Sequence, residues 1–370
     1  MNEKNYRRKP KKEESLFTMT AIPHSELVSK IKRYDKLILS KPDYAEAYFN
    51  RGVLFIQLGR FEEAIKDYDR AIQIKHNYAD AFNNRGIALQ ELGQLEQALE
   101  NYDRAIQINP NYAEVYVSRG IALQEFGQLE KAIESCNSAI ELNPSSNTAQ
   151  HILNSLLGND VRSVPEEYIK NLFNKYAQNF ENHLVNKLSY TSPSFFKKTL
   201  AGLGLTNKNF NKAIDLGCGT GLVGVEFRNM VDVLIGIDLS EKMIRQAKEK
   251  NVYDKLIASD LINGLQALKT NFDLFISADV FAYIGDLDSL FDSVKKHANN
   301  ESLFIFSTED LAGDGFFLQQ TGRFAHSKNY ILSTASYYGF QLEHFEQYNP
   351  RKNKGEWIVG GIYVLRNIIK

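Results

Sequence analysis

A period of 34 residues organises the first half of the chain. Gly52, Gly86 and Gly120 stand 34 residues apart, and small or aromatic residues recur in step with them. The other recurring sets are Tyr48, Phe82 and Tyr116; Gly59, Gly93 and Gly127; Ala64, Ala98 and Ala132; Tyr68, Tyr102 and Cys136; and Ala71, Ala105 and Ala139. This period predicts stacked helical hairpins, because the small residues let two antiparallel helices approach and each unit buries its apolar face against the next.

The repeat resembles the tetratricopeptide repeat family, in which each unit is a pair of helices. Pro110 and Pro144 stand at the ends of two units, as the family pattern requires. We expect three full units, flanked by half-units at 25–41 and 145–157. The resemblance therefore implies an all-α solenoid over residues 25–158.

This resemblance implies a concave face that binds an extended peptide. The matching positions on the first helix of each unit are polar and mildly acidic. They are Glu46, Asp80, Glu114, Asn50, Asn84 and Ser118. A basic or polar protein segment is the favoured partner, and a solvated face that only packs within the chain is the alternative.

Composition excludes several other kinds of protein. A net charge of −1 over 370 residues gives no global attraction to nucleic acid or anionic lipid. Only Cys136 and Cys218 are present, so neither a disulfide framework nor a metal site is expected, and a reducing compartment is favoured. No apolar run reaches about 18 residues, which predicts no membrane span and a cytoplasmic protein. Residues 1–24 lack apolar periodicity and are predicted to be a disordered tail.

From residue 210 onward, short apolar runs alternate with helical patterns. Strands are predicted at 212–216, 232–237, 254–258, 272–277 and 302–307, with helices at 222–230, 241–250, 261–269 and 286–298. This alternation predicts an α/β doubly wound parallel sheet covered by helices, within a second domain over 159–370. A helix near 326–338 and two strands, at about 340–347 and 356–366, are predicted to close the sheet with an antiparallel hairpin.

A glycine-rich turn follows the first strand, in Asp215-Leu216-Gly217-Cys218-Gly219-Thr220-Gly221. Alternating glycines indicate a backbone that a ligand approaches closely. The turn resembles the S-adenosylmethionine loop of Rossmann-like class I methyltransferases. From about residue 42 onward, the chain resembles a bacterial family of predicted methyltransferases with tetratricopeptide repeats in front. A dinucleotide is the alternative ligand, since 219–224 also fits G-x-G-x-x-G. The Asp215 carboxylate would repel a pyrophosphate and attract a sulfonium, which favours S-adenosylmethionine.

The resemblance also implies a donor site at specific residues. Asp238, at the end of the second strand, is placed to accept hydrogen bonds from ribose hydroxyls. Met243 matches a residue that lies against adenine, and Asp260 matches one that receives the adenine amino group. The remaining donor-binding positions are Tyr176, Asp215, Gly217, Cys218, Gly219, Gly221, Leu239 and Asp279.

Candidate acceptor residues lie after the fourth strand and before the last helix. Tyr283 follows the fourth strand, where reacting groups meet in this fold. His326 is placed to act as a general base and Arg323 to hold a substrate carboxylate. The alternative is a packed histidine beside an arginine paired with Glu309 or Asp310. Neither an Asn-Pro-Pro-Tyr nor a Pro-Cys element stands there, which argues against methylation of adenine N6, glutamine amides or cytosine C5.

The sequence thus predicts an S-adenosylmethionine-dependent methyltransferase whose repeats recruit or position a substrate. A protein side chain and a small metabolite both remain open as acceptors. The alternative from another class is a repeat scaffold whose methyltransferase-like domain binds the donor without turnover. Residues 166–190 are apolar on one helical face and form a candidate lid, in which His183 is expected to be half-buried.

Overall fold

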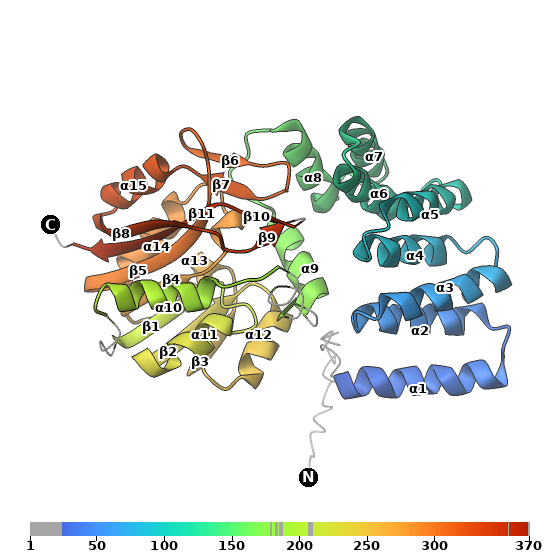
Figure 1. Ribbon diagram of the computed structural model, residues 1–370, viewed down its shortest axis with the longest axis horizontal. Helices are drawn as coiled ribbons and strands as arrows, with labels where there is room; N and C mark the ends of the chain where they lie inside the picture. The colour runs from blue at the N-terminus through green and yellow to red at the C-terminus, as the bar shows by residue number, and fades with distance from the viewer. Residues whose placement is uncertain are drawn as a thin grey trace, which may run out of the picture.

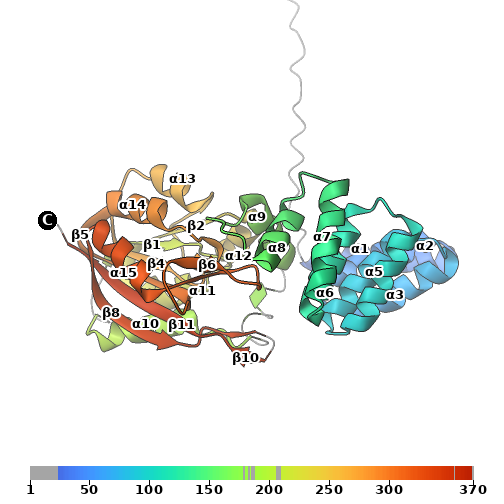
Figure 2. The same ribbon diagram turned by 90° about the horizontal axis from the view of Figure 1, so that it is seen from above.

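The computed structural model describes residues 24–177, 180–181, 184, 188–205, 210–353 and 355–368. Two parts lie side by side, a stack of helices and an α/β part, and α8 and α9 lie between them in both views (Figures 1 and 2). Among the described residues, no helix is long and apolar enough to cross a membrane.

The helical stack consists of three hairpins and two single helices. Its members are α1 (His24–Ser40), α2 (Ala45–Gln57), α3 (Phe61–Ile74), α4 (Ala79–Glu91), α5 (Leu95–Ile108), α6 (Ala113–Phe126), α7 (Leu129–Leu142) and α8 (Asn147–Leu157). The two predicted half-units correspond to α1 and α8. Within the middle hairpin, a Cβ atom at Gly86 would stand 2.6 Å from Cε1 of the fully buried Tyr102, so only glycine permits this approach.

Arginines spaced by the same period tie neighbouring helices together. Each one comes from the first helix of a unit and pairs with an aspartate on the helix before it. The pairs are Arg51 with Asp35 at 2.7 Å, Arg85 with Asp69 at 2.8 Å and Arg119 with Asp103 at 2.7 Å. The repeat in the sequence is therefore a repeat in polar contacts as well as in packing.

Nine strands form one mixed sheet in the described part of the α/β domain. They are β1 (Phe210–Leu216), β2 (Val231–Asp238), β3 (Lys255–Ala258), β4 (Phe272–Ser277), β5 (Ala298–Asp310), β6 (Phe316–Leu318), β7 (Phe324–His326), β8 (Phe340–Tyr348) and β11 (Gly360–Asn367). The order is β3-β2-β1-β4-β5-β11-β8, and β11 runs antiparallel to both neighbours. The predicted doubly wound sheet with an antiparallel closure is confirmed.

Helices cover both faces of this sheet (Figure 2). On one face, α10 (Ser192–Gly202) and α11 (Leu222–Phe227) pack against the strands through residues such as Phe196 and Phe227. On the other face, α13 (Leu261–Gln266), α14 (Asp288–Lys296) and α15 (Lys328–Tyr337) do so through residues such as Phe291 and Ile331. The remaining helix of the α/β alternation is α12 (Glu241–Glu249).

Several elements differ from the sequence prediction. The last helix begins at Lys328, because Phe324–His326 form β7, which pairs with β6 and with the end of β5. Ser327 caps α15 by accepting a hydrogen bond from the Tyr330 backbone amide at 3.1 Å. Three further elements were not predicted. They are α10, β6 and β9 (Lys352–Asn353). The strand predicted at about 356–366 is divided into β10 (Glu356–Trp357) and β11.

Helix α9 (Glu166–Tyr176) is the first part of the candidate lid. It is fixed to α12, because Ser240 Oγ donates a hydrogen bond to Asn174 Oδ1 at 2.8 Å. It also touches the stack, where Asn147 Nδ2 donates to Glu167 Oε2 at 2.7 Å. The rest of the predicted helical stretch falls partly outside the described residues, His183 included.

Candidate active site

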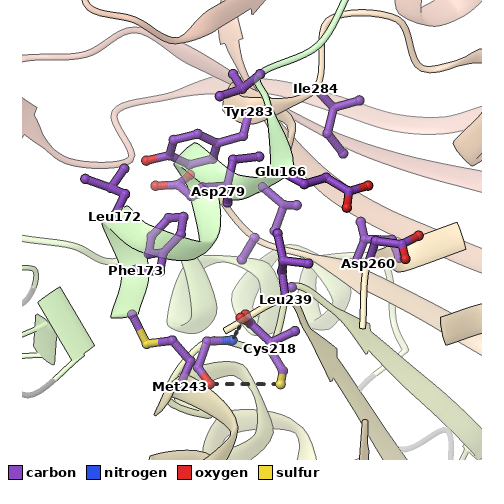
Figure 3. A pocket seen from close by; sticks show the side chains of 18 of the residues that line it. Glu166, Leu172, Phe173, Cys218, Leu239, Met243, Asp260, Asp279, Tyr283 and Ile284 are labelled. Atoms are coloured by element: carbon purple, nitrogen blue, oxygen red, sulfur yellow. Dashed lines mark hydrogen bonds between the residues drawn. The ribbon is translucent and has the colours of Figure 1, made fainter. Parts of the chain in front are cut away.

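A cavity of about 770 Å³ lies at the carboxyl ends of β1, β2 and β4. Ligands of open α/β sheets bind at this edge, where the strand order reverses. Side chains of α9 cover the cavity, among them Leu172 and Phe173 (Figure 3). The side nearest the glycine turn is lined by Gly217, Cys218, Gly219, Asp238, Leu239, Met243 and Asp260.

The glycine turn needs its glycines for two different reasons. Gly217, Gly219 and Gly221 all have positive φ, at 79°, 53° and 92°. A Cβ atom at Gly217 would lie 2.3 Å from Val280 Cγ2, so the turn and the segment after β4 are in close contact. At Gly219 the nearest atom to such a Cβ is 4.0 Å away, which leaves the backbone open to the cavity.

Asp238 is held rigidly in the cavity wall. Its Oδ1 accepts a hydrogen bond from the Ser240 backbone amide, and its Oδ2 accepts one from the Gly219 amide, both at 2.8 Å. Loss of solvent raises the pKa of this carboxyl to about 6. The carboxylate retains free lone pairs toward the cavity, which suits hydroxyl donors.

Asp215 lies behind the turn. Neither Gly221 nor Asp215 is among the described residues that line the cavity. Its side chain is fully buried, and the Tyr253 hydroxyl donates a hydrogen bond to its Oδ2 at 2.6 Å. Burial raises its pKa to about 7. The structure therefore gives Asp215 and Gly221 no direct contact with the cavity, unlike Gly217, Cys218 and Gly219.

The far end of this donor side is formed by α12 and α13. Met243 and Leu239 give an apolar wall, and Asp260 lies opposite (Figure 3). Asp260 also caps α13, because its Oδ1 accepts a hydrogen bond from the Asn263 amide at 2.9 Å. For Tyr176, the structure describes the backbone as the end of α9 but not the side chain.

The opposite end of the cavity carries a compact group of charges. Arg323 pairs with Glu309 at 2.5 Å, and Arg351 bridges Glu309 at 3.2 Å and Asp279 at 3.3 Å. Both arginines and Asp279 line the cavity. The ion pair between Arg323 and Glu309, which the sequence offered as the alternative to substrate binding, is thus observed. Arg323 nevertheless also lines the cavity.

Tyr283 lies at this charged end. Its ring meets that of Phe173 edge-on, with centroids 5.2 Å apart. Loss of solvent raises the pKa of its hydroxyl. The candidate acceptor residues Tyr283 and Arg323 therefore come together in one place.

His326 does not join them. It is fully buried and missing from the described lining of the cavity. Its Nε2 donates a hydrogen bond to the Gly285 carbonyl at 2.9 Å, and burial lowers its pKa to about 4. This placement favours the packed histidine over the general base.

Sequence reasoning missed Arg351 as a cavity residue. It stands in the polar link between β8 and β11, where no periodic pattern marks it. The folding of the closing hairpin brings Arg351 into contact with Asp279, which follows β4. The short strand β7 also went unpredicted, although it places Arg323 beside Glu309.

The predicted groove residues of the repeats lie on α2, α4 and α6. Several of them already have partners within the chain. Glu46 pairs with Lys75 at 3.6 Å, Asp80 accepts from the Tyr112 hydroxyl at 2.8 Å, Asn84 donates to the Asp80 carbonyl and Ser118 donates to the Glu114 carbonyl. Glu114 also lines a smaller cavity of about 310 Å³ between the end of the stack and α9.

No cluster of His, Cys, Asp or Glu suited to a metal ion occurs within the described ranges. Both cysteines are buried and free.

Family models match both parts of the chain. Residues 54–93 match a TPR repeat model, and 79–112 and 113–146 each match a tetratricopeptide repeat model. Residues 207–348 match a model described as a methyltransferase domain.

Individual known proteins match over shorter stretches. The biotin biosynthesis bifunctional protein BioHC of Saccharophagus degradans is 24% identical over 139 residues, which cover 36% of this chain and 24% of that protein. The chain thus spans about a quarter of the length of this curated relative.

Solved structures are similar at low identity. Magnesium protoporphyrin IX methyltransferase (ChlM) from Synechocystis PCC 6803, with bound SAH, is 14% identical with a TM-score of 0.42, over 55% of this chain and 99% of that one. The N-methyltransferase NodS from Bradyrhizobium japonicum WM9, in complex with S-adenosyl-L-homocysteine, is 19% identical with a TM-score of 0.39, over 47% and 86%. On the family models, the chain carries N-terminal tetratricopeptide repeats and a C-terminal methyltransferase domain of the class I fold.

Proposed function

We propose that this protein is an S-adenosylmethionine-dependent methyltransferase that binds the donor in the 770 Å³ cavity. The observation that carries the proposal is the donor side of that cavity. An open backbone at Gly219, a rigidly held carboxylate at Asp238 and an apolar wall at Met243 meet there. When bound, the donor would supply an electrophilic methyl group on a sulfonium.

The residues present fit this donor. Asp238 would accept hydrogen bonds from ribose hydroxyls, and Leu239 and Met243 would lie against the base. Asp260 would receive its amino group. Asp215 would act at one remove, by fixing Tyr253, whose hydroxyl also accepts a hydrogen bond from the Gly224 amide at 3.1 Å.

The acceptor would enter at the end that carries Tyr283 and Arg323. Much of the rate enhancement in such transfers comes from holding two reactants in line, and α9 helps by keeping water out. The acceptor would be a small metabolite or a single side chain of a protein. The domain would begin near residue 159.

We infer that the repeats bind a protein or peptide segment. Support comes from the exposed first helices, which present Glu114 and Asn50, and from the cavity that joins α6 to α9. The alternative is a scaffold that binds the donor without turnover. The two free cysteines support a reducing compartment such as the cytoplasm.

Calorimetry with S-adenosylhomocysteine tests the donor site on the full chain. We expect binding by the wild type and at least roughly tenfold weaker binding by Asp238→Ala, which removes a charged hydrogen-bond acceptor. Asp292→Ala, an exposed aspartate on α14 that pairs with Lys296, is the matched control. No heat for the wild type, or equal affinity for Asp238→Ala, would refute the assignment.

A tritium-transfer screen separates the enzyme from the scaffold. Lysate is incubated with methyl-labelled donor and either the wild type or Asp238→Ala, and label is then counted in protein and small-molecule fractions. Label that depends on Asp238 supports the enzyme, and its fraction gives the acceptor class. Donor binding with no transfer to any fraction would support the scaffold.

A further inference from the structure

Asp279 has a backbone that marks it out among the residues of the cavity. Its φ is 58°, and only three other non-glycine residues in the described ranges have positive φ. They are Ser189, Asn251 and Glu301, none of which lines the cavity. Left-handed backbone costs free energy in a residue with a side chain, so it persists where the surrounding contacts enforce it, often at functional sites.

Two neighbours lock the Asp279 side chain. The backbone amide of Asp279 donates a hydrogen bond to Ser307 Oγ at 2.9 Å, and Ser307 Oγ donates to Asp279 Oδ1 at 3.1 Å. Arg351 Nε donates to Oδ2 at 3.3 Å. Ser307 is almost fully buried, so this support is part of the sheet. A carboxylate fixed in this way is preoriented for a ligand.

Each oxygen of Asp279 still has room for a further hydrogen bond. A carboxylate offers about four acceptor positions, and two are used within the chain. Arg351 is shared with Glu309, which also pairs with Arg323. The group of Arg323, Arg351, Glu309 and Asp279 therefore carries no net charge. A ligand amine at Asp279 would not face an excess of positive charge.

Aromatic rings lie beside this carboxylate. Figure 3 shows Asp279 next to Tyr283, with Phe173 of α9 close by. The Phe173 and Tyr283 rings are in edge-to-face contact, at 78° with centroids 5.2 Å apart, so a ligand in the cavity would lie against the pair rather than between the two rings. A carboxylate beside aromatic faces is the combination that recognises an amine, through a charge-assisted hydrogen bond and cation–π attraction.

We propose that Asp279, Phe173 and Tyr283 form an amine-binding subsite at the acceptor end of the cavity, so that the methyl acceptor is an amine. The bound amine would first lose a proton to water, and its nitrogen lone pair would then form the N–C bond as the C–S bond of the donor breaks and leaves its electron pair on sulfur. The proposal rests on the proposed function, since it places this subsite next to the donor. A different role for Asp279 would be to hold the ammonium group in the amino-acid part of the donor itself.

Two donor analogues tell these roles apart without knowledge of the acceptor. S-adenosylhomocysteine lacks any group in place of the methyl, whereas sinefungin carries an amine on the carbon that replaces the sulfur. Both share the amino-acid and nucleoside parts. The affinity ratio between them therefore reports on the surroundings of the transferred methyl alone.

The experiment is calorimetry of both analogues with the full-length wild type, Asp279→Asn and Asp286→Asn. Asparagine tolerates the left-handed backbone and keeps the hydrogen bond from Ser307, so Asp279→Asn changes mainly the charge. We expect the wild type to bind sinefungin roughly tenfold more tightly than S-adenosylhomocysteine, as one charge-assisted hydrogen bond would give. Asp279→Asn should lose this preference and bind S-adenosylhomocysteine within about threefold of the wild type.

Asp286→Asn is the matched control, because it removes the same charge from another residue that lines the cavity. Asp286 pairs with Arg162 at 3.4 Å. The Asp286→Asn variant should keep the preference for sinefungin. Ser307→Ala is a second variant, which should reduce the preference in part by loosening Asp279.

Three results would overturn the proposal. Equal weakening of both analogues in Asp279→Asn would assign the carboxylate to the amino-acid part of the donor. A wild type with no preference for sinefungin would remove the amine subsite while leaving the donor site intact. A wild type that binds neither analogue would refute the proposed function, and the subsite with it.

Discussion

His151 Nε2, on the last helix of the repeats, donates a hydrogen bond to the carbonyl oxygen of Gly322 in the methyltransferase domain at 2.9 Å. The His151 ring also lies against that of Tyr168 on α9, with centroids 4.5 Å apart. Arg323, the next residue after Gly322, lines the cavity. One side chain of the repeats thus contacts two segments that line the cavity, namely α9 and the loop that carries Arg323.

We expect His151→Ala to destabilise the full chain by about 1–3 kcal/mol, because it removes a buried hydrogen bond and leaves a void. Urea denaturation followed by circular dichroism measures this change. His76→Ala, at an exposed histidine of the stack, is the control and should stay within about 0.5 kcal/mol of the wild type. Equal effects of the two changes would show that the contact between the domains contributes no stability.

The repeats offer a matched pair of glycines. Gly86→Ala should destabilise by about 1–3 kcal/mol, because the new Cβ would stand 2.6 Å from the buried Tyr102 ring. Gly120→Ala should lie within about 1 kcal/mol of the wild type, because Cys136 replaces the tyrosine there and its Sγ is 3.1 Å away. Thermal unfolding of both variants checks the order, and the reverse order would contradict the packing argument.

Donor-analogue binding should depend on pH through Asp238. The pKa of this carboxyl is raised to about 6, so it is ionised above that pH and takes up a proton below it. An ionised carboxylate accepts hydrogen bonds from hydroxyls more strongly. The affinity for S-adenosylhomocysteine should therefore be constant above about pH 7 and fall below pH 6, by at most about tenfold per pH unit.

Calorimetry between pH 5 and pH 8 measures this profile, with Asp238→Asn as the comparison. The variant should bind more weakly and show no step near pH 6. A step that persists in Asp238→Asn would point instead to Asp215, whose pKa is raised to about 7.

Acid should destabilise the folded protein through His326. Burial lowers its folded pKa to about 4, whereas the unfolded chain binds the proton near 6.5. The unfolded state thus holds more protons in this window, so stability is full above about pH 6.5 and falls toward pH 4. The loss amounts to about 3 kcal/mol for this group.

The test compares urea denaturation of the wild type and His326→Gln at several pH values between 7.5 and 4.5. The variant should be less stable at pH 7.5 and lose less stability on acidification. His151, whose pKa is also lowered by burial, adds a slope of the same sign that both proteins share. Parallel pH profiles would exclude His326 as the titrating group.

The sequence determined the parts that depend on local repetition. Helical spacing and small residues repeat every 34 positions, so the half-units predicted at 25–41 and 145–157 match α1 and α8 closely. The α/β alternation predicted a doubly wound parallel sheet with an antiparallel closure, because each strand is a separate apolar run with its own helix. The glycine turn predicted a cavity wall at Gly217 and Gly219 for the same local reason.

Only the tertiary structure decided which polar side chains reach the cavity. Arg351 arrives there through the closing hairpin, and His326 is withdrawn from it by the pairing of β7 with β5. Both depend on contacts between segments distant in sequence, which no periodic pattern encodes. Asp215 is the plainest case, since its position in the turn is fixed locally, yet its carboxylate is committed to Tyr253 on a neighbouring segment of the fold.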